Sequence, residues 1–245
     1  PTGQGHSSER GLPLEWSEST NVLWKAPVPG RGWSSPVVAD GRVWLTTSTD
    51  EGAGSLRLLA YDIETGLEVL NTEVFRVDQT ASPNPKNSLA SPTPIVDADA
   101  NRVYVHFGAD GTAALTTDGE ILWATHFPHV TQHGNGGSPV LYRDRLILSV
   151  DGYDTAFVVA LDAATGEQHY SERAHAQTYR ASPVAADGKI YVTARDGTVP
   201  VLKAGPKFEV LSKNKIADQL TASPTLANGR IYLRGFKALY AIGKK

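Results

Sequence analysis

The sequence predicts an all-β protein: a five-bladed β-propeller of four-stranded antiparallel blades, in which an N-terminal strand completes the last blade. Three observations support this prediction: five copies of one repeat, turn signals between β-rich runs in each copy, and complementary fragments at the two ends of the chain. Repetition of one strand-rich unit is typical of propellers. We therefore expect a single domain over residues 1–245.

Each repeat opens on a Ser-Pro pair, and proline is tolerated at a strand start because its missing N–H costs little there. The pairs begin at Ser35, Ser91, Ser138, Ser182 and Ser223. A short apolar segment, a turn and a β-rich run follow each pair. Several turns contain Asp-Gly or Asn-Gly, which tolerate the positive φ of tight hairpins. These features predict the first two strands of each blade.

Third and fourth strands follow, joined by a corner such as AYDIETG at 60–66. The fifth repeat reaches this corner at Gly243 and has no fourth run. Pro200 lies in the third run of the fourth repeat, so we expect an irregular edge there. The predicted blades cover about 34–75, 90–127, 137–174, 181–216 and 222–245.

The missing strand is predicted at residues 21–28. NVLWKAPV aligns with EILWATHF at 120–127, which places Trp24 in register with Leu70, Trp123, Tyr170 and Leu211. A large apolar side chain at this position packs between neighbouring blades. We expect residues 21–28 to pair with the last strand of blade five and to cover its edge, leaving residues 1–20 as an extension.

Other architectures fit less well. A two-sheet sandwich would not show five copies of one pattern, and a six- or seven-bladed ring would need further Ser-Pro units. An internally shortened relative of a longer ring remains an alternative.

Composition excludes several classes of partner. With 23 Lys and Arg against 26 Asp and Glu, the chain has no broad positive field for nucleic acid. It has no cysteine for a disulfide or thiolate site, and no apolar run of the length that spans a membrane. We expect a monomer. Because the chain begins at Pro1 rather than Met, a preceding targeting segment stays possible.

The corners carry a family resemblance. AYDIETGLEVL at 60–70 and ALDAATGEQHY at 160–170 resemble the tryptophan-docking repeat of pyrroloquinoline quinone (PQQ) type propellers, and 114–123 keeps the final tryptophan. This family includes quinoprotein alcohol dehydrogenases and the outer-membrane assembly lipoprotein. The resemblance, which covers nearly the whole chain from Asn21, implies a propeller and a periplasmic or otherwise extracytoplasmic location. The dehydrogenases usually have eight blades and a vicinal Cys pair, so we expect neither PQQ nor Ca²⁺ as a cofactor.

Ligands of propellers meet the connections between blades at the channel mouth, here 29–34, 76–90, 128–137, 175–181 and 217–222. The polar connection 76–90 is longer than a turn requires, which favours a functional role. The candidate ligand-binding residues are Arg31, Trp33, Asn84, Lys86, Asn87, His129, His133, Asn135, Tyr179 and Arg180. Their aromatic, cationic and amide groups suit a protein, peptide or small polar ligand such as a carbohydrate. The alternative is that they are ordinary solvated loop residues.

Metal and catalytic sites are not predicted. His126, His129 and His133 have a ligand-like spacing, but no nearby acidic residue completes the set. Acidic loop residues could bind Ca²⁺, although their Asp-Gly steps are explained as turns; they are Asp50, Glu51, Asp110, Asp151, Asp154 and Asp196. The sequence therefore favours a non-catalytic binding or scaffold propeller. The alternative is an enzyme, either a PQQ-dependent oxidoreductase relative or a carbohydrate-active hydrolase or lyase.

Overall fold

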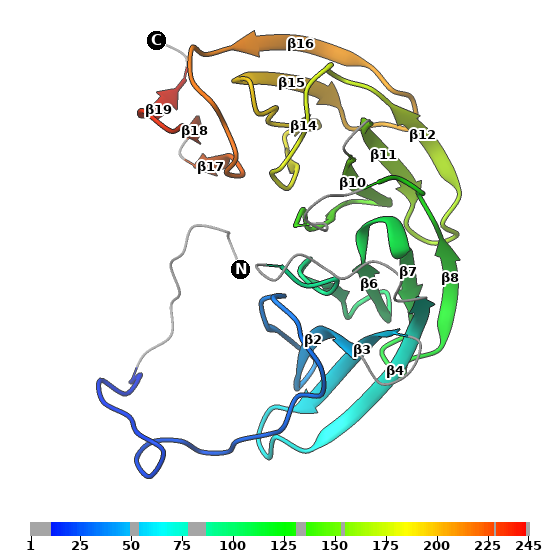
Figure 1. The fold of residues 1–245 in the computed structure, drawn as a ribbon, viewed down its shortest axis with the longest axis vertical. Helices are drawn as coiled ribbons and strands as arrows, with labels where there is room; N and C mark the ends of the chain where they lie inside the picture. Colours follow the sequence, from blue (N-terminus) through cyan, green and yellow to red (C-terminus); the bar gives the residue numbers. More distant parts are fainter. Residues whose placement is uncertain are drawn as a thin grey trace.

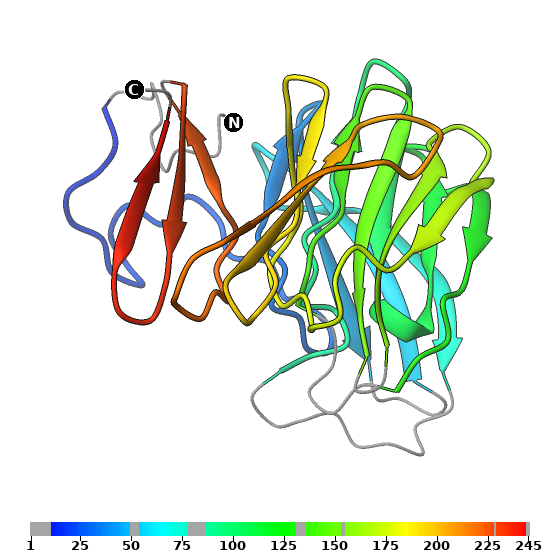
Figure 2. The same cartoon turned by 90° about the horizontal axis from the view of Figure 1, so that it is seen from above.

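The computed structural model describes residues 11–49, 54–77, 87–130, 136–152, 155–227 and 229–243, which form five antiparallel sheets arranged as successive blades (Figure 1). In each blade the strands follow chain order from the inner to the outer edge. Seen from above, the strands run between two opposite rims (Figure 2). The only helical element among the described residues is a 3₁₀ turn, η1 (Gly108–Asp110). The all-β prediction is confirmed.

The strands of each blade have the following bounds. Blade one contains β1 (Val37–Ala39), β2 (Arg42–Thr49), β3 (Gly54–Asp62) and β4 (Glu68–Val77). Blade two contains β5 (Ile95–Asp97), β6 (Arg102–His106), β7 (Thr112–Leu115) and β8 (Ile121–Thr125). Blade three contains β9 (Val140–Tyr142), β10 (Arg145–Asp151), β11 (Ala156–Asp162) and β12 (Gln168–Glu172). Blade four contains β13 (Val184–Ala186), β14 (Lys189–Tyr191), β15 (Thr198–Lys203) and β16 (Val210–Lys215). Blade five contains β17 (Thr225–Ala227), β18 (Arg230–Arg234) and β19 (Leu239–Ile242).

A chain of hydrogen bonds joins the starts of the inner strands. The Ser35 N–H donates to Thr93 Oγ1 at 3.1 Å, and the Thr93 N–H donates to Ser138 Oγ at 3.0 Å. The Ser138 N–H then donates to Ser182 Oγ, and the Ser182 N–H to Ser223 Oγ, each at 3.0 Å. We call this the hydroxyl ladder. Each blade is thereby tied to the next at the residue that opens its repeat.

The ladder corrects one position of the predicted repeat. In blade two the ladder residue is Thr93 and not Ser91, because Pro94 is the proline that directly precedes β5. Ser91 instead donates its hydroxyl to the Ser88 carbonyl at 2.8 Å. The sequence Ser-Pro-Thr-Pro offers two hydroxyl-proline pairs, and only the second lies next to the strand.

Blades also dock through large side chains of their outer strands. Trp123 of β8 donates its Nε1–H to the Ala163 carbonyl at 3.2 Å, and an added Cβ at Gly166 would lie 2.6 Å from its ring. Trp24 contacts blade one in the same way, since its Nε1–H donates to the Ile63 carbonyl at 3.0 Å and its ring covers Gly66. Both corner glycines have φ of at least +70°, so they satisfy the turn and the close approach together. The predicted equivalence of Trp24 and Trp123 is confirmed.

The predicted pairing of residues 21–28 with blade five is wrong in this structure. Within the described residues, 21–28 form no strand, and blade five is a three-stranded sheet that ends at β19. Figure 1 shows the N-terminal segment beside blade one and separated from β17, β18 and β19. Its tryptophan contacts hold the segment on blade one, and the five blades form an open arc.

Buried apolar residues lie mainly between neighbouring blades. One core cluster joins blades one and two, others join blades two and three or three and four, and a small one joins blades four and five. Pro200 lies in β15, which pairs with both β14 and β16. The expectation of an irregular edge there is wrong, because β14 ends at Tyr191 and the Pro200 carbonyl still accepts the Val192 N–H at 3.1 Å.

The hydroxyl ladder predicts a matched pair of variants. Ser138→Ala removes the acceptor of the Thr93 N–H and should lower the free energy of unfolding by about 1–3 kcal/mol. Ser138→Thr retains the hydroxyl, as blade two itself does at Thr93, and should stay within about 0.5 kcal/mol of the original protein. Urea unfolding followed by tryptophan fluorescence measures both. Equal stability of the two variants would contradict a structural role for the ladder.

Candidate functional site

One rim carries the connections between blades and the turns between second and third strands; we call it the mouth rim. Backbone hydrogen bonds fix each described connection to the blade that follows. Arg31 and Ser48 exchange N–H···O bonds of 2.8 and 2.9 Å, and the Arg195 N–H donates to the Thr178 carbonyl at 3.0 Å. Leu220 forms the corresponding bridge with Gly235. Side chains on these connections are therefore presented from a fixed backbone.

Three of the predicted residues come together on blade one. The Arg31 guanidinium lies 5.4 Å from the centre of the Trp33 ring, a distance suited to a cation–π contact. The Ser88 hydroxyl donates to the Arg31 carbonyl at 3.0 Å, next to Asn87. Trp33 is 52% exposed. Arg31, Trp33 and Asn87 form what we call the Trp33 surface, an aromatic face on an ordered connection.

Four other predicted residues, Asn84, Lys86, His133 and Asn135, lie outside the described residues. So do Asp50, Glu51 and Asp154 among the acidic loop residues. The proposed His126, His129 and His133 run therefore has no complete geometry. Among the described parts of the chain, no group of three His, Asp or Glu side chains is arranged to hold a metal ion.

The remaining predicted residues, His129, Tyr179 and Arg180, gather around Asp151 at the end of β10. Tyr179 is 1% exposed, so it is part of the wall and not the open aromatic platform that the sequence suggested. Its hydroxyl donates to the His175 carbonyl at 3.1 Å, and burial raises its pKa to about 12. Arg180 is exposed and its charge acts on Asp151.

Asp151 is the residue that the sequence reading undervalued. Its Oδ1 is buried and has no hydrogen-bond partner. Burial raises its pKa to about 6, against the opposing effects of a backbone hydrogen bond from Tyr179 and the charges of Arg180 and His129. The Asp151-Gly152 step has the appearance of an ordinary turn in the sequence. Only the packing of blade three against its neighbours shows that the carboxyl group is partly withdrawn from water.

His129 and His106 extend this group. The Nδ1 of His129 lies 2.5 Å from the Phe127 carbonyl, and its Nε2 is buried without a partner. His106, at the end of β6, is 1% exposed and its Nδ1 lies 2.8 Å from Thr112 Oγ1. Its Nε2 is also unpartnered, and burial, with the charge of His129, lowers its pKa to about 3. We call His106, Asp110, His129, Asp151 and Arg180 the His129 cluster.

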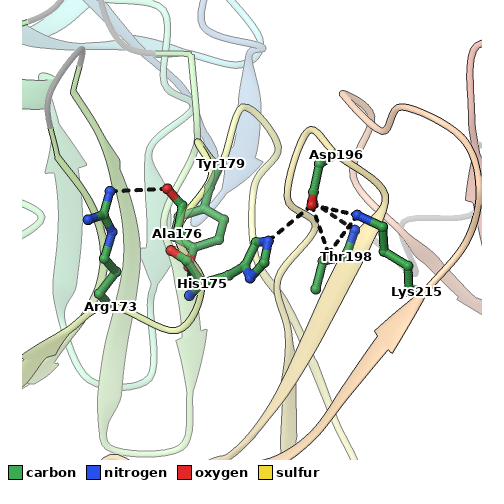
Figure 3. A network of polar contacts seen from close by, with 7 residues as sticks. All are labelled: Arg173, His175, Ala176, Tyr179, Asp196, Thr198 and Lys215. Carbon is green, nitrogen blue, oxygen red and sulfur yellow. Dashed lines mark hydrogen bonds and ion pairs between the residues drawn. The ribbon is translucent and has the colours of Figure 1, made fainter.

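A second polar network ties blades three and four at the same rim (Figure 3). Asp196 Oδ2 accepts hydrogen bonds from Lys215 Nζ at 2.5 Å and from Thr198 Oγ1 at 3.1 Å, and lies 3.1 Å from His175 Nε2. Burial alone would raise the pKa of Asp196, but these bonds hold it well below its usual value. The acidic loop residue that the sequence assigned to a turn therefore also fixes the connection containing Tyr179.

Asp151 predicts an unusual pH dependence. Its native pKa of about 6 lies above the unfolded value of 3.8, so stability is greatest below pH 3.8 and falls as the pH rises through 6. Asp151→Asn should remove up to about 3 kcal/mol of this decrease. The test compares urea unfolding of both proteins between pH 4.5 and 8. His106 affects both proteins alike, and Asp144→Asn, with a side chain 64% exposed, serves as control. Parallel pH profiles would refute the assignment.

Asp196 predicts a local effect. Asp196→Asn keeps the side-chain shape but weakens the charged contacts with Lys215 and His175. Because the side chain is 30% exposed, we expect a cost of about 1 kcal/mol. Amide hydrogen exchange over 175–181 should then be roughly fivefold faster. Asp118→Asn, on a more exposed ion pair with Arg42, should leave this segment unchanged. A similar acceleration in both variants would contradict the role of the network.

Comparisons with known proteins agree with the fold. A sequence profile described as outer membrane protein assembly factor BamB matches residues 7–202. BamB of Escherichia coli (strain K12) is 32% identical over 101 residues, 41% of this chain and 24% of that protein. The crystal structure of BamB from Moraxella catarrhalis has a TM-score of 0.62 and 22% identity, covering 92% of this chain and 62% of that one.

A quinohemoprotein alcohol dehydrogenase from Pseudomonas putida has a TM-score of 0.61 at 13% identity, covering 88% of this chain and 42% of that protein. This likeness concerns the fold alone. The aligned region spans about a quarter of the length of the curated relatives it matches. The described residues contain no helix with the length and apolarity needed to cross a bilayer.

Proposed function

Because the chain belongs to the family of outer membrane protein assembly factor BamB, we propose that it is a non-catalytic scaffold propeller whose mouth rim binds a protein partner. The family description concerns the assembly of outer-membrane proteins, which supports an extracytoplasmic location and a protein as the ligand. We propose that the folded chain acts as a monomer in this role.

The Trp33 surface is the observation that carries this proposal. A large aromatic side chain that is half exposed, contacted by an arginine and held on a hydrogen-bonded connection has the composition of an interface anchor. Ordering such a loop on binding would cost free energy. Here the backbone is already fixed to Ser48 and Ala90, so the surface is prepared for a partner before contact.

The interior of the arc supports binding rather than acid–base catalysis. The five inner strands carry a single carboxylate, Asp97, which lies at the end of β5. A pair of carboxylates across the substrate is what glycoside hydrolysis uses. The structural likeness to quinoprotein dehydrogenases is at 13% identity and brings no residue-level match. Titration with PQQ and Ca²⁺ is the direct check, and stoichiometric quinone absorbance with dye reduction would overturn the proposal.

The partner can be sought by site-specific photo-crosslinking. A photoreactive amino acid at position 33 should crosslink a partner protein in cells, whereas the same group at Leu67, exposed on a different rim, should not. Once the partner is purified, its dissociation constant is measured by calorimetry. Trp33→Ala should weaken binding about thirtyfold, as expected for an anchor worth about 2 kcal/mol.

Leu67→Ala is the matched control, since it also removes an exposed apolar side chain. It should leave the dissociation constant unchanged. Equal crosslinking from both positions, or equal affinity of both alanine variants, would place the interface elsewhere and contradict the proposal.

A further inference from the structure

We propose that the His129 cluster binds a primary ammonium group, with His129 Nε2 and Asp151 Oδ1 accepting two of its N–H groups. The inference rests on the proposed function in one respect: the ammonium group would belong to a lysine side chain of the bound protein. The site itself is argued from described residues at the junction of blades two, three and four.

The hydrogen bonding of His129 fixes what it can offer. Its Nδ1 faces the Phe127 carbonyl at 2.5 Å, and a carbonyl oxygen can only accept. Nδ1 therefore carries the proton, and in the neutral ring Nε2 is a bare acceptor. That atom is buried and lacks a partner. Buried acceptors without a donor are rare and unfavourable, so this one is suited to a donor supplied from outside the chain.

Asp151 supplies the second acceptor and the charge. An added Cβ on the adjacent Gly152 would lie 3.2 Å from His129 Cβ, which places the two side chains on neighbouring backbone. No hydrogen bond or ion pair joins them, although both are described, and Oδ1 of Asp151 is buried and unpartnered. Burial raises the pKa of both Asp151 and Asp110. A bound cation would relieve the cost that burial imposes on these carboxylates.

The surrounding groups select the ligand class. Asp110 and Asp151 are opposed only by the exposed Arg180, while His106 is neutral and His126 acts on Asp110 from the rim. An anion would meet two carboxylates. A hydroxyl has one hydrogen to donate and the two acceptors need two, whereas an ammonium group has three. Among described residues there is no three-ligand arrangement for a metal ion.

A pair of cations with equal charge tests the proposal. The probe is n-butylammonium, which has N–H donors, and the control is tetramethylammonium, which has none. The 245-residue chain is titrated at pH 7.5 and followed by ¹⁵N NMR of the His129 ring and ¹³C NMR of the Asp151 carboxylate. We expect saturable shifts of both signals with n-butylammonium, and a pKa of Asp151 that falls when the probe is present.

Variants separate the site from general charge effects. Asp151→Asn and His129→Phe should each weaken n-butylammonium binding by about tenfold or more. Asp144→Asn, an equal charge change on an exposed side chain, should not alter it. Circular dichroism confirms that each variant is folded, and a melted His129→Phe variant leaves Asp151→Asn as the deciding protein.

Two results would overturn the inference. One is an equal response to both cations, and the other is unchanged binding in Asp151→Asn; either result would mean that water satisfies the two acceptors. Failure of the partner experiment at Trp33 with saturable ammonium binding here would instead leave this site standing without the proposed function. Partner binding without ammonium binding would refute this site alone.

Discussion

The arrangement of the chain depends on the hydroxyl ladder, in which the residue that opens each blade donates its N–H to the hydroxyl of the next. A backbone donor buried near the centre of the arc needs a partner, and the neighbouring strand of its own blade starts too late to provide one. A serine or threonine at this position satisfies the donor and fixes the spacing between blades. Proline can follow it because its own N–H is not required.

The same spacing places the mouth rim. Once the inner strands are tied, the connections between blades pass over the ends of the second strands and bond to them. Trp33 is presented outward on one connection, while Tyr179 is drawn inward on another by its bonds to His175. Two residues predicted for one role thus have opposite exposure, because their connections differ in how the backbone turns toward the adjacent blade.

The sequence predicted the periodic part of the molecule and missed what depends on contacts between repeats. Turn residues and strand runs were visible because their signals are local, and the equivalence of Trp24 with Trp123 followed from alignment of repeats. Ring closure was wrong because alignment establishes which strand a segment resembles, and says nothing about the curvature that brings the two ends together. His106 and Asp151 carry no local signal at all. Their importance comes from burial between blades.

The interblade cores differ in size. The cluster between blades one and two contains Trp44, Phe75 and Phe107 among many other buried residues, whereas that between blades four and five contains only Val199, Leu220 and Leu233 among its buried members. In an array whose units contact only their neighbours, stability is a sum of unit and interface terms. Local unfolding will therefore begin at blade five and spread inward, so the chain loses order from one end while the tryptophan-docked end stays folded.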